Sequence, residues 1–430
     1  MLGKGIQFNR NELAGAFGDI GTDIPLVAGM ILASGMDTAS VLTVFGLLQI
    51  LSGLAYRIPM PVQPLKAVAA LVIAQKLPAS LVFGGGLAIG VVMLPLAAFG
   101  LLGGLAKIIP KSVVRGIQFG LGLMLCRLAL GNYVLADGVP GYVVAGVSAI
   151  LTLWLLGHRK YPPALGVILL GLIYAFVLNS AALQSLARFT PALPQPHLPI
   201  PRDILQGFLL LALPQIPLSL GNSILATEQM TRDLFPERKI TFRKIGLTYS
   251  IMNLITPFLS GIPVCHGSGG MAGHCAFGAR TGGSVIIYGA ALLLAGLCFS
   301  PGFDALIHAF PLPVLGVILF FEGLTLMRFL RDTAQTEKDL AIALLVGALA
   351  AFLPYGFLIG MIVGTLVAFL SKHHQVGFCR EEPLAKLLEK TVGVEPDPPK
   401  HAENALISST GGTRSTASGG VLQEAQEVPE

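Results

Sequence analysis

Two interrupted apolar stretches carry groups suited to binding a small anion. The first spans residues 58–66 and reads IPMPVQPLK. Its prolines cannot lie inside a helix, because proline lacks an N–H donor and clashes with the preceding turn. Proline is favoured at the first helical position, so we expect a short helix to begin at Pro64, continue through Leu65, and end near Gln75. Its first amides have no intrahelical partner and carry partial positive charge, which predicts half of an anion site.

The second stretch spans residues 261–274 and reads GIPVCHGSGGMAGH. Glycine lets a ligand approach the backbone closely, so Ser268, Gly269 and Gly270 are expected to open a second half-helix. If the positive ends of the two half-helices converge near the middle of a membrane, a small oxyanion fits between them. His266 is a candidate for sensing pH or binding substrate, and a satisfied structural histidine explains it equally well. The alternative is that both stretches are kinks packed against neighbouring segments.

Polar side chains elsewhere could complete such a site. Thr22 lies in the first apolar segment, and Asn222 with Ser223 lies in the segment that resembles it later in the chain. Together with Gln63 and Lys66, Thr22 and Asn222 are expected to donate hydrogen bonds to the ligand.

Intramembrane carboxylates are costly and mark transport pathways or pair with cations. Asp19 is such a residue, and Lys66 is its expected partner. Lys66 either contacts substrate or only neutralises Asp19, and the sequence weighs these roles equally. Asp23 is expected to lie nearer water. Glu322 is a candidate for carrying a coupling proton, and its alternative is a glutamate that faces an aqueous crevice.

The composition requires elements that cross a membrane. The 430 residues are 53% hydrophobic and 12% charged, whereas soluble domains contain roughly 25% charged residues. Several uncharged runs match or exceed the ~20 residues that cross the hydrocarbon core. We therefore expect an all-α polytopic membrane protein embedded in a lipid bilayer. The net charge of +5 is modest and dispersed, so no nucleic-acid partner is expected.

Proline, glycine and charge clusters divide the chain into about fourteen segments, two of them half-helices (segments 3 and 10). The segments are expected near residues 12–34, 39–56, 64–76, 78–106, 111–131, 139–157, 162–187, 203–228, 242–260, 268–278, 282–300, 312–330, 338–353 and 356–372. Most basic residues then fall on one side, which the positive-inside rule makes the cytoplasm, with both termini inside.

Short motifs recur along the chain at similar spacing. Ile24-Pro25 recurs as Ile216-Pro217, a shift of 217 − 25 = 192 residues, and Ile58-Pro59 recurs as Ile262-Pro263, a shift of 263 − 59 = 204. Unless these matches arise by chance, they predict a 7+7 inverted repeat, with residues 1–187 as the first half and 188–375 as the second. Residues 376–430 are polar and predict a disordered cytoplasmic tail.

Metal chemistry is not expected. Cys265, His266, His274 and Cys275 resemble a zinc ligand set, but His274 and Cys275 are adjacent on a helix and project in different directions. No zinc-type C-x-x-C pair accompanies them. We therefore expect neither a metal nor a cofactor, and no enzymatic activity. An intramembrane metalloenzyme is the alternative, and it would require bound zinc.

With these motifs in view, the chain resembles the molybdate transporter family, a branch related to the SulP sulfate permeases. The resemblance runs from about Asn11 to Lys372 and rests on residues 15–25, 59–66, 214–222 and 265–282. It implies a core domain (segments 1–4 and 8–11) that holds substrate against a gate domain (segments 5–7 and 12–14). Family members usually read Pro-Met-Lys where this chain has Pro64-Leu65-Lys66. The tail is too short and too polar to form the cytoplasmic regulatory domain of SulP permeases, so we do not expect that domain.

The expected function is therefore secondary active import of molybdate across the cell (inner) membrane by alternating access, with protons as the coupling ion. Accumulating a dianion against an interior-negative potential costs about 2.3 kcal/mol per charge per 100 mV, which is why coupling is expected. The alternatives are a transporter of sulfate or another small anion on the same fold, and a passive anion channel. A homodimer is compatible with either.

Overall fold

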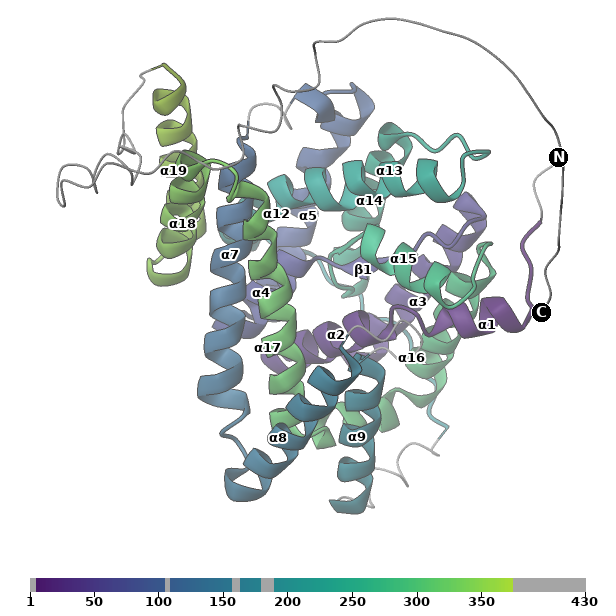
Figure 1. Ribbon diagram of the computed structural model, residues 1–430. Helices are drawn as coiled ribbons and strands as arrows, with labels where there is room; N and C mark the ends of the chain where they lie inside the picture. The colour runs from purple at the N-terminus through teal and green to yellow at the C-terminus, as the bar shows by residue number, and fades with distance from the viewer. Residues whose placement is uncertain (1–4, 105–108, 157–162, 179–188, 374–430) are drawn as a thin grey trace, which may run out of the picture. The chain divides into compact units, whose positions relative to one another are not determined.

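The computed structural model describes residues 5–104, 109–156, 163–178 and 189–373 (Figure 1). These parts are almost entirely helical, and eight of the helical stretches are long and apolar enough to cross a membrane. Shorter apolar helices cover Lys66–Gln75, Pro163–Val177 and Gly356–Ser371. The expectation of an all-α polytopic membrane protein is confirmed, with one added two-stranded antiparallel ladder. The predicted tail at 376–430 lies outside the described residues.

The first half of the chain contains mostly long helices, together with two short ones of 7 and 10 residues. Its elements are α1 (Arg10–Ala16), α2 (Ile20–Ser34), α3 (Thr38–Tyr56), β1 (Gln63–Pro64), α4 (Lys66–Gln75), α5 (Ala79–Ala98), α7 (Lys111–Leu128), the π-helix η1 (Ala129–Tyr133), α8 (Gly138–Leu155) and α9 (Pro163–Leu178). The segment expected at 12–34 is thus broken between α1 and α2, and Asp19 lies at this break as the N-cap residue of α2.

The second half contains more short helices and more π- and 3-10-helical turns than the first. Its elements are α11 (Pro201–Gly207), η2 (Phe208–Ala212), α12 (Leu213–Leu218), η3 (Ser219–Leu225), α13 (Ala226–Leu234), α14 (Phe242–Ile255), η4 (Thr256–Leu259), β2 (Val264–Cys265), α15 (Ser268–Ala276), α16 (Gly283–Ala309), α17 (Leu312–Arg328), η5 (Phe329–Thr333), α18 (Glu337–Phe352) and α19 (Gly356–His373). The run from α11 to α13 is continuous, and its π-helical turns flank the prolines Pro214 and Pro217.

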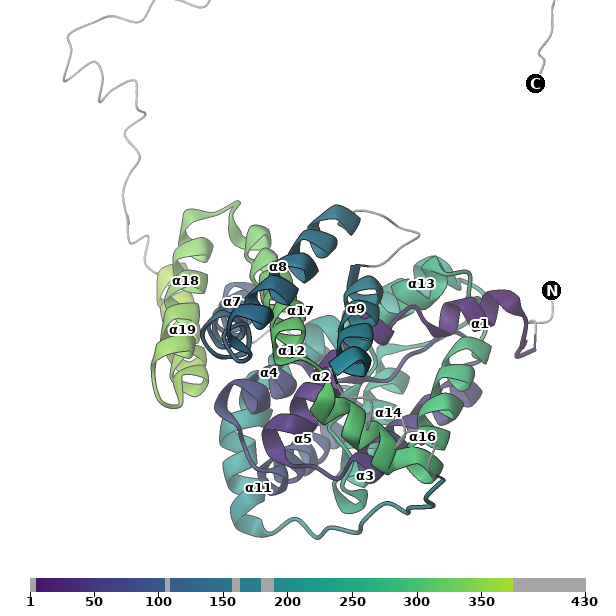
Figure 2. The same cartoon turned by 90° about the horizontal axis from the view of Figure 1, so that it is seen from below.

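The helices pack in two groups. The first group consists of α7, α8, α9, α17, α18 and α19, whose mutual contacts include α7 with α17 and α18, and α8 with α9. In both views α7, α18 and α19 lie together (Figure 1, Figure 2). The second group contains the remaining helices, among which α3 packs on α16 and α5 packs on α11 and α14. Helices α4 and α2 of the second group touch α7, α9 and α17 of the first.

An amide side chain holds the extended backbone before each half-helix. Gln49 on α3 donates to the Val62 carbonyl (2.7 Å) and accepts from the Val62 amide (3.0 Å). Asn253 on α14 binds both backbone groups of Val264 in the same way, at 2.7 and 2.9 Å. Buried backbone groups that leave a helix need such partners, because an unsatisfied group costs several kcal/mol in an apolar region.

The helices before the two extended stretches also end alike. Arg57 closes α3 and Ser260 closes η4, and each has a left-handed backbone with φ of 56° and 52°. The shift between them is 260 − 57 = 203 residues, close to the 204 of the Ile-Pro motif. The two halves therefore share the local structure that interrupts a span. The inverted repeat and the count of fourteen segments remain predictions, which this equivalence supports.

Glu12 fixes the beginning of α16. Its carboxylate is 2% exposed and accepts hydrogen bonds from the amides of Arg280 (2.9 Å), Thr281 (2.8 Å) and Ser284 (2.9 Å). A negative group at a helix N-terminus is stabilised by the free amides and by the helix dipole. This contact ties α1 to the loop between α15 and α16.

Replacing Glu12 by alanine should destabilise the fold. The change leaves the buried amides of Thr281 and Ser284 without an acceptor, and each costs about 1–3 kcal/mol, so the free energy of unfolding in mild detergent should fall by at least about 2 kcal/mol. Glu337→Ala is the matched control, since Glu337 also lies in the first turn of a helix but is exposed. Equal effects of the two variants would contradict the capping role.

Candidate functional site

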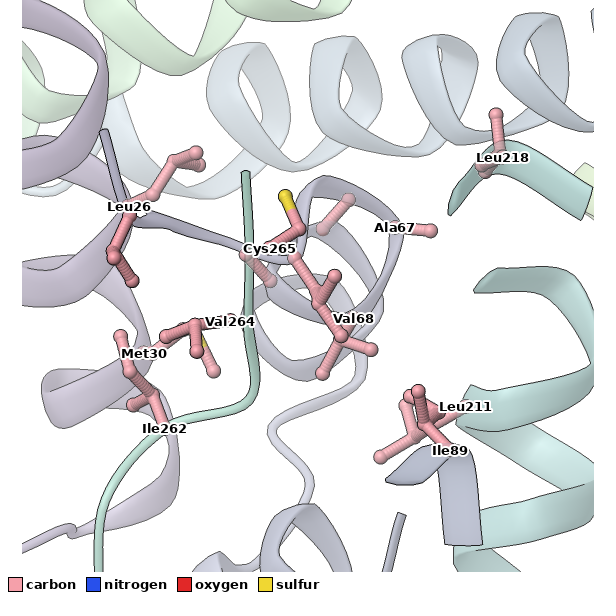
Figure 3. Packing of buried hydrophobic residues seen from close by; sticks show 14 of the residues in the cluster. Leu26, Met30, Ala67, Val68, Ile89, Leu211, Leu218, Ile262, Val264 and Cys265 are labelled. Atoms are coloured by element: carbon pink, nitrogen blue, oxygen red, sulfur yellow. The ribbon is translucent and has the colours of Figure 1, made fainter. Parts of the chain in front are cut away.

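The two half-helices begin on either side of the β-ladder. Strands β1 and β2 are antiparallel, with Gln63 opposite Cys265 and Pro64 opposite Val264. Figure 3 shows β2 beside Ala67 and Val68 at the start of α4, with Leu26 and Met30 of α2 on its other side. All of these labelled side chains are buried. The ladder therefore brings the N-termini of α4 and α15 together within the protein interior.

The start of α4 differs from the prediction in two ways. The helix begins at Lys66 rather than Pro64, because Pro64 belongs to the ladder and Leu65 is the N-cap residue. The amides of Ala67 and Val68 donate to the side-chain oxygen of Gln215 on α12, at 3.0 and 3.3 Å. A protein side chain thus occupies most of this helix end, and an anion cannot bind these two amides without displacing it.

The sequence prediction did not include Gln215. Its amide nitrogen donates to Ser219 Oγ at 3.0 Å, and Ser219 lies 2.8 Å from the hydroxyl of Tyr249. Gln215 is 3% exposed. A glutamine between two prolines in an apolar segment was a usable signal, since buried polar side chains require partners.

The start of α15 has free amides. The helix begins at Ser268 as predicted, and within the described part of the chain no acceptor bonds the amides of Ser268, Gly269 or Gly270. Gly269 is exposed, and a Cβ built on it would meet no atom within 4 Å. Open space therefore lies beside the first turn of α15, and free amides at the positive end of a helix dipole are an arrangement that binds anions.

Asp19 and Gln63 form one wall of this end. The Gln63 amide nitrogen donates to both oxygens of Asp19, at 2.8 and 2.7 Å, and both residues are buried. A Cβ on Gly270 would collide with the Asp19 carboxylate, and one on Gly267 would collide with the Gln63 side chain. Glycine is required at these two positions because the wall lies directly against the backbone.

Lys66 pairs with Glu322, and the predicted partner Asp19 is wrong. The Lys66 ammonium lies 2.8 Å from Glu322 Oε1, whereas the Asp19 carboxylate accepts its hydrogen bonds from Gln63. The Lys66 side chain is 38% exposed and that of Glu322 is 17% exposed. Because Lys66 is on α4 and Glu322 is on α17, the pair links the two helix groups.

The other predicted site residues take different roles. Thr22 on α2 and Asn222 on η3 are half-buried, and the described residues offer their side chains no hydrogen bond. His266 is 1% exposed, with Nδ1 3.0 Å from the Pro61 carbonyl and Nε2 2.9 Å from Thr248 Oγ1. Both ring nitrogens of His266 are thus occupied, which favours the structural interpretation over substrate binding.

Asp23 is not near water, contrary to the prediction. Asp23 is 0% exposed, and it lies on α2 one helical turn after Asp19. Neither carboxylate oxygen has a hydrogen-bond partner within the described residues. Glu228, four residues before Arg232 on α13, in contrast has a cationic partner, because the two side chains form an ion pair at 2.8 Å. No group of three histidine, cysteine or acidic side chains in the described ranges is placed to hold a metal ion.

Comparison with known proteins gives one consistent result. A family model described as "Molybdate transporter of MFS superfamily" matches residues 11–125 and 207–326. Molybdate transporter 2 of Arabidopsis thaliana is 33% identical over 388 residues, covering 79% of this chain and 82% of its own length. Molybdate transporter 1 of the same plant is 31% identical over 378 residues, covering 78% and 82%.

Solved structures share the fold at low sequence identity. The transmembrane domain of the cyanobacterial bicarbonate transporter BicA superposes with a TM-score of 0.59 at 16% identity, covering 84% of this chain and 97% of that one. The murine anion transporter Slc26a9 in its inward-facing state superposes with a TM-score of 0.64 at 12% identity, covering 87% and 70%. These identities are too low to compare ligands, so they establish the architecture alone.

Proposed function

Because the chain belongs to the molybdate transporter family, we propose that it imports molybdate into the cytoplasm as a secondary active transporter. The observation that carries this proposal is the unoccupied start of α15, where the amides of Ser268, Gly269 and Gly270 have no acceptor. A tetrahedral dianion can accept hydrogen bonds from several such amides at once. The matching family model and the similar plant proteins are transporters and not enzymes, which supports this proposal.

Lys66 supplies the positive charge of the proposed site. Its ammonium is partly exposed and heads the helix whose start adjoins that of α15 across the β-ladder. The amide of Lys66 also has no acceptor in the described parts. Thr22 and Asn222 have uncommitted side chains and are the proposed further donors. Gln63, Pro64 and Leu65 position this end: Gln63 holds Asp19, and Pro64 and Leu65 hold the backbone of α4 against β2.

The division into two helix groups supports a proposal of alternating access. We assign α7–α9 and α17–α19 as the moving gate and the remaining helices as the core that carries the anion. The Lys66–Glu322 ion pair then joins gate to core. An incoming dianion competes with Glu322 for Lys66, so binding weakens the link and releases one group from the other. In this proposal the protein lies in the inner cell membrane, and both of its termini face the cytoplasm.

Import needs an energy source because the substrate is doubly negative. Moving two charges against 100 mV costs about 4.6 kcal/mol, which a passive anion channel cannot supply. Protons are the proposed coupling ion. A channel predicts uptake that follows voltage alone, whereas a proton symporter predicts uptake that rises with an inward proton gradient at fixed voltage.

A competition experiment tests the substrate. Purified protein in proteoliposomes should take up labelled molybdate. Unlabelled molybdate should suppress this uptake at a concentration at least about tenfold lower than the concentration of sulfate that has the same effect. A tenfold difference corresponds to about 1.4 kcal/mol of binding free energy. Liposomes without protein are the control for leakage. Equal potency of the two anions would overturn the molybdate assignment and leave a general oxyanion transporter.

A further inference from the structure

Asp23 is a buried carboxyl group that the proposed binding site does not use. It is 0% exposed, and both of its oxygens lack a hydrogen-bond partner among the described residues. Burying an ionised carboxylate without hydrogen bonds is among the costliest arrangements in a protein interior. A protonated carboxyl group is neutral and can be stabilised by a single neighbouring acceptor. The surroundings of Asp23 therefore suit a group that binds and releases a proton.

Two further side chains beside Asp23 are unsatisfied. The Tyr288 hydroxyl on α16 interacts with Asp23 but completes no hydrogen bond of normal geometry, and Tyr288 is 4% exposed. His274 on α15 is 0% exposed, and its ring lies 6.5 Å from that of Tyr288. Its ring interacts with the backbone of Gly15, but neither nitrogen completes a hydrogen bond of normal geometry among the described residues. Native interiors rarely leave neighbouring polar groups unpaired. Asp23 can therefore accept a proton without breaking a hydrogen bond of normal geometry.

The corresponding position in the second half shows what a structural residue does there. Superposing Ile24-Pro25 on Ile216-Pro217 places Asp23 on Gln215, because 215 − 23 = 192. Gln215 is neutral, and both ends of its amide are hydrogen-bonded, to the start of α4 and to Ser219. Asp23 has the opposite character, since it is ionisable and unpaired. Its chemistry is therefore not explained by helix packing.

The charge balance links Asp23 to the anion. Three carboxylates, Asp19, Asp23 and Glu322, surround the single ammonium of Lys66, so the site is negative before a dianion enters. We propose that Asp23 is the proton-binding residue that couples molybdate import to proton entry. Protonation of Asp23 neutralises its negative charge. Asp23 lies one helical turn after Asp19, and the Asp19 carboxylate lies against the start of α15. Proton and anion binding then strengthen each other reciprocally.

This inference rests on the proposed function and names the coupling group within it. The titratable or charged side chains that face Asp23 come from every helix and strand packed around it, directly or through one neighbour. They are Asp19 on α2, Lys66 on α4, Cys265 on β2, Tyr288 on α16, His274 behind Tyr288 on α15, and Glu322 on α17 through its bond to Lys66. Helix α9 also packs on α2 and carries Tyr174 as its titratable residue. Lys66 is the cation of this set, and its ammonium is bound to Glu322.

The test separates exchange from coupled uptake. Wild type and Asp23→Asn are reconstituted in proteoliposomes with the voltage clamped at zero, and labelled molybdate is measured first in exchange at equal pH and then under an inward gradient of one pH unit. Coupling to one proton raises wild-type accumulation about tenfold under this gradient. Asp23→Asn should retain exchange and lose this rise. Asp203→Asn, on α11 and outside the cluster, should behave as wild type.

Each other outcome is decisive. If Asp23→Asn accumulates molybdate as wild type does, or loses exchange as completely as coupled uptake, the inference is overturned while the transport function stands. If wild type itself fails to exchange molybdate, the proposed function and this inference fail together. Should Asp23→Asn not fold, Tyr288→Phe carries the test. Removing that hydroxyl should shift the pH at which coupled uptake is half-maximal, and an unchanged pH profile would overturn the proposal.

Discussion

Replacing Gly269 by valine should abolish molybdate uptake while leaving the fold intact. A Cβ at this position meets no atom within 4 Å, so the valine side chain fits without displacing the protein. It would occupy the space in front of the free amides at the start of α15, where the anion is proposed to bind. We expect molybdate affinity to fall by about 100-fold or more, which corresponds to at least about 2.7 kcal/mol of binding free energy.

Gly146→Val is the matched control for this change. Gly146 also lies within a helix, is exposed, and has no atom within 4 Å of a built Cβ, but it belongs to α8. Both variants add the same side chain and pay the same penalty for β-branching in a helix. Purified protein should elute as wild type does in both cases, and calorimetric titration with molybdate should detect binding only to Gly146→Val. Binding of equal strength to the two variants would move the site away from α15.

The sequence was sufficient to predict where the spans break, because that information is local. Prolines and glycines at residues 58–66 and 261–274 exclude a continuous helix whatever surrounds them. The start of α15 at Ser268 follows from this rule. The start of α4 was predicted two residues early, because Pro64 pairs with Val264 in a ladder that only the folded chain brings together.

Pairings between distant residues were the part that sequence reasoning could not determine. Asp19, Gln63, Lys66 and Glu322 were all identified as important, but the sequence paired Lys66 with Asp19 and not with Glu322, because a carboxylate can pair with any nearby donor. Glu322 is 256 residues from Lys66 along the chain, and the packing of α17 against the core decides their contact. Gln215 was missed for the same reason, since its partners lie on α4.

A double-substitution cycle at Lys66 and Glu322 should show that Lys66 binds the anion. Lys66→Gln removes the ammonium at the site, and truncating one partner of a charge pair costs about 2–5 kcal/mol, so we expect molybdate affinity to fall at least about 30-fold. Glu322→Gln removes the carboxylate that competes for Lys66 and should tighten binding. The double variant should bind as weakly as Lys66→Gln, because no ammonium remains.

The cycle distinguishes two roles that a single substitution confuses. If Lys66 only neutralised Glu322, then removing both charges would restore affinity to near the wild-type value, and that recovery would refute substrate binding by Lys66. Lys111→Gln is the control, because Lys111 also faces a carboxylate, Asp332 at 3.7 Å, on the surface of the other helix group. Its exposed ion pair is worth at most about 1 kcal/mol, and its loss should leave molybdate affinity unchanged. Uptake by Glu322→Gln also tests whether the Lys66–Glu322 pair holds the gate against the core. If it does, this variant should bind molybdate more tightly, and its transport rate should change independently of its affinity.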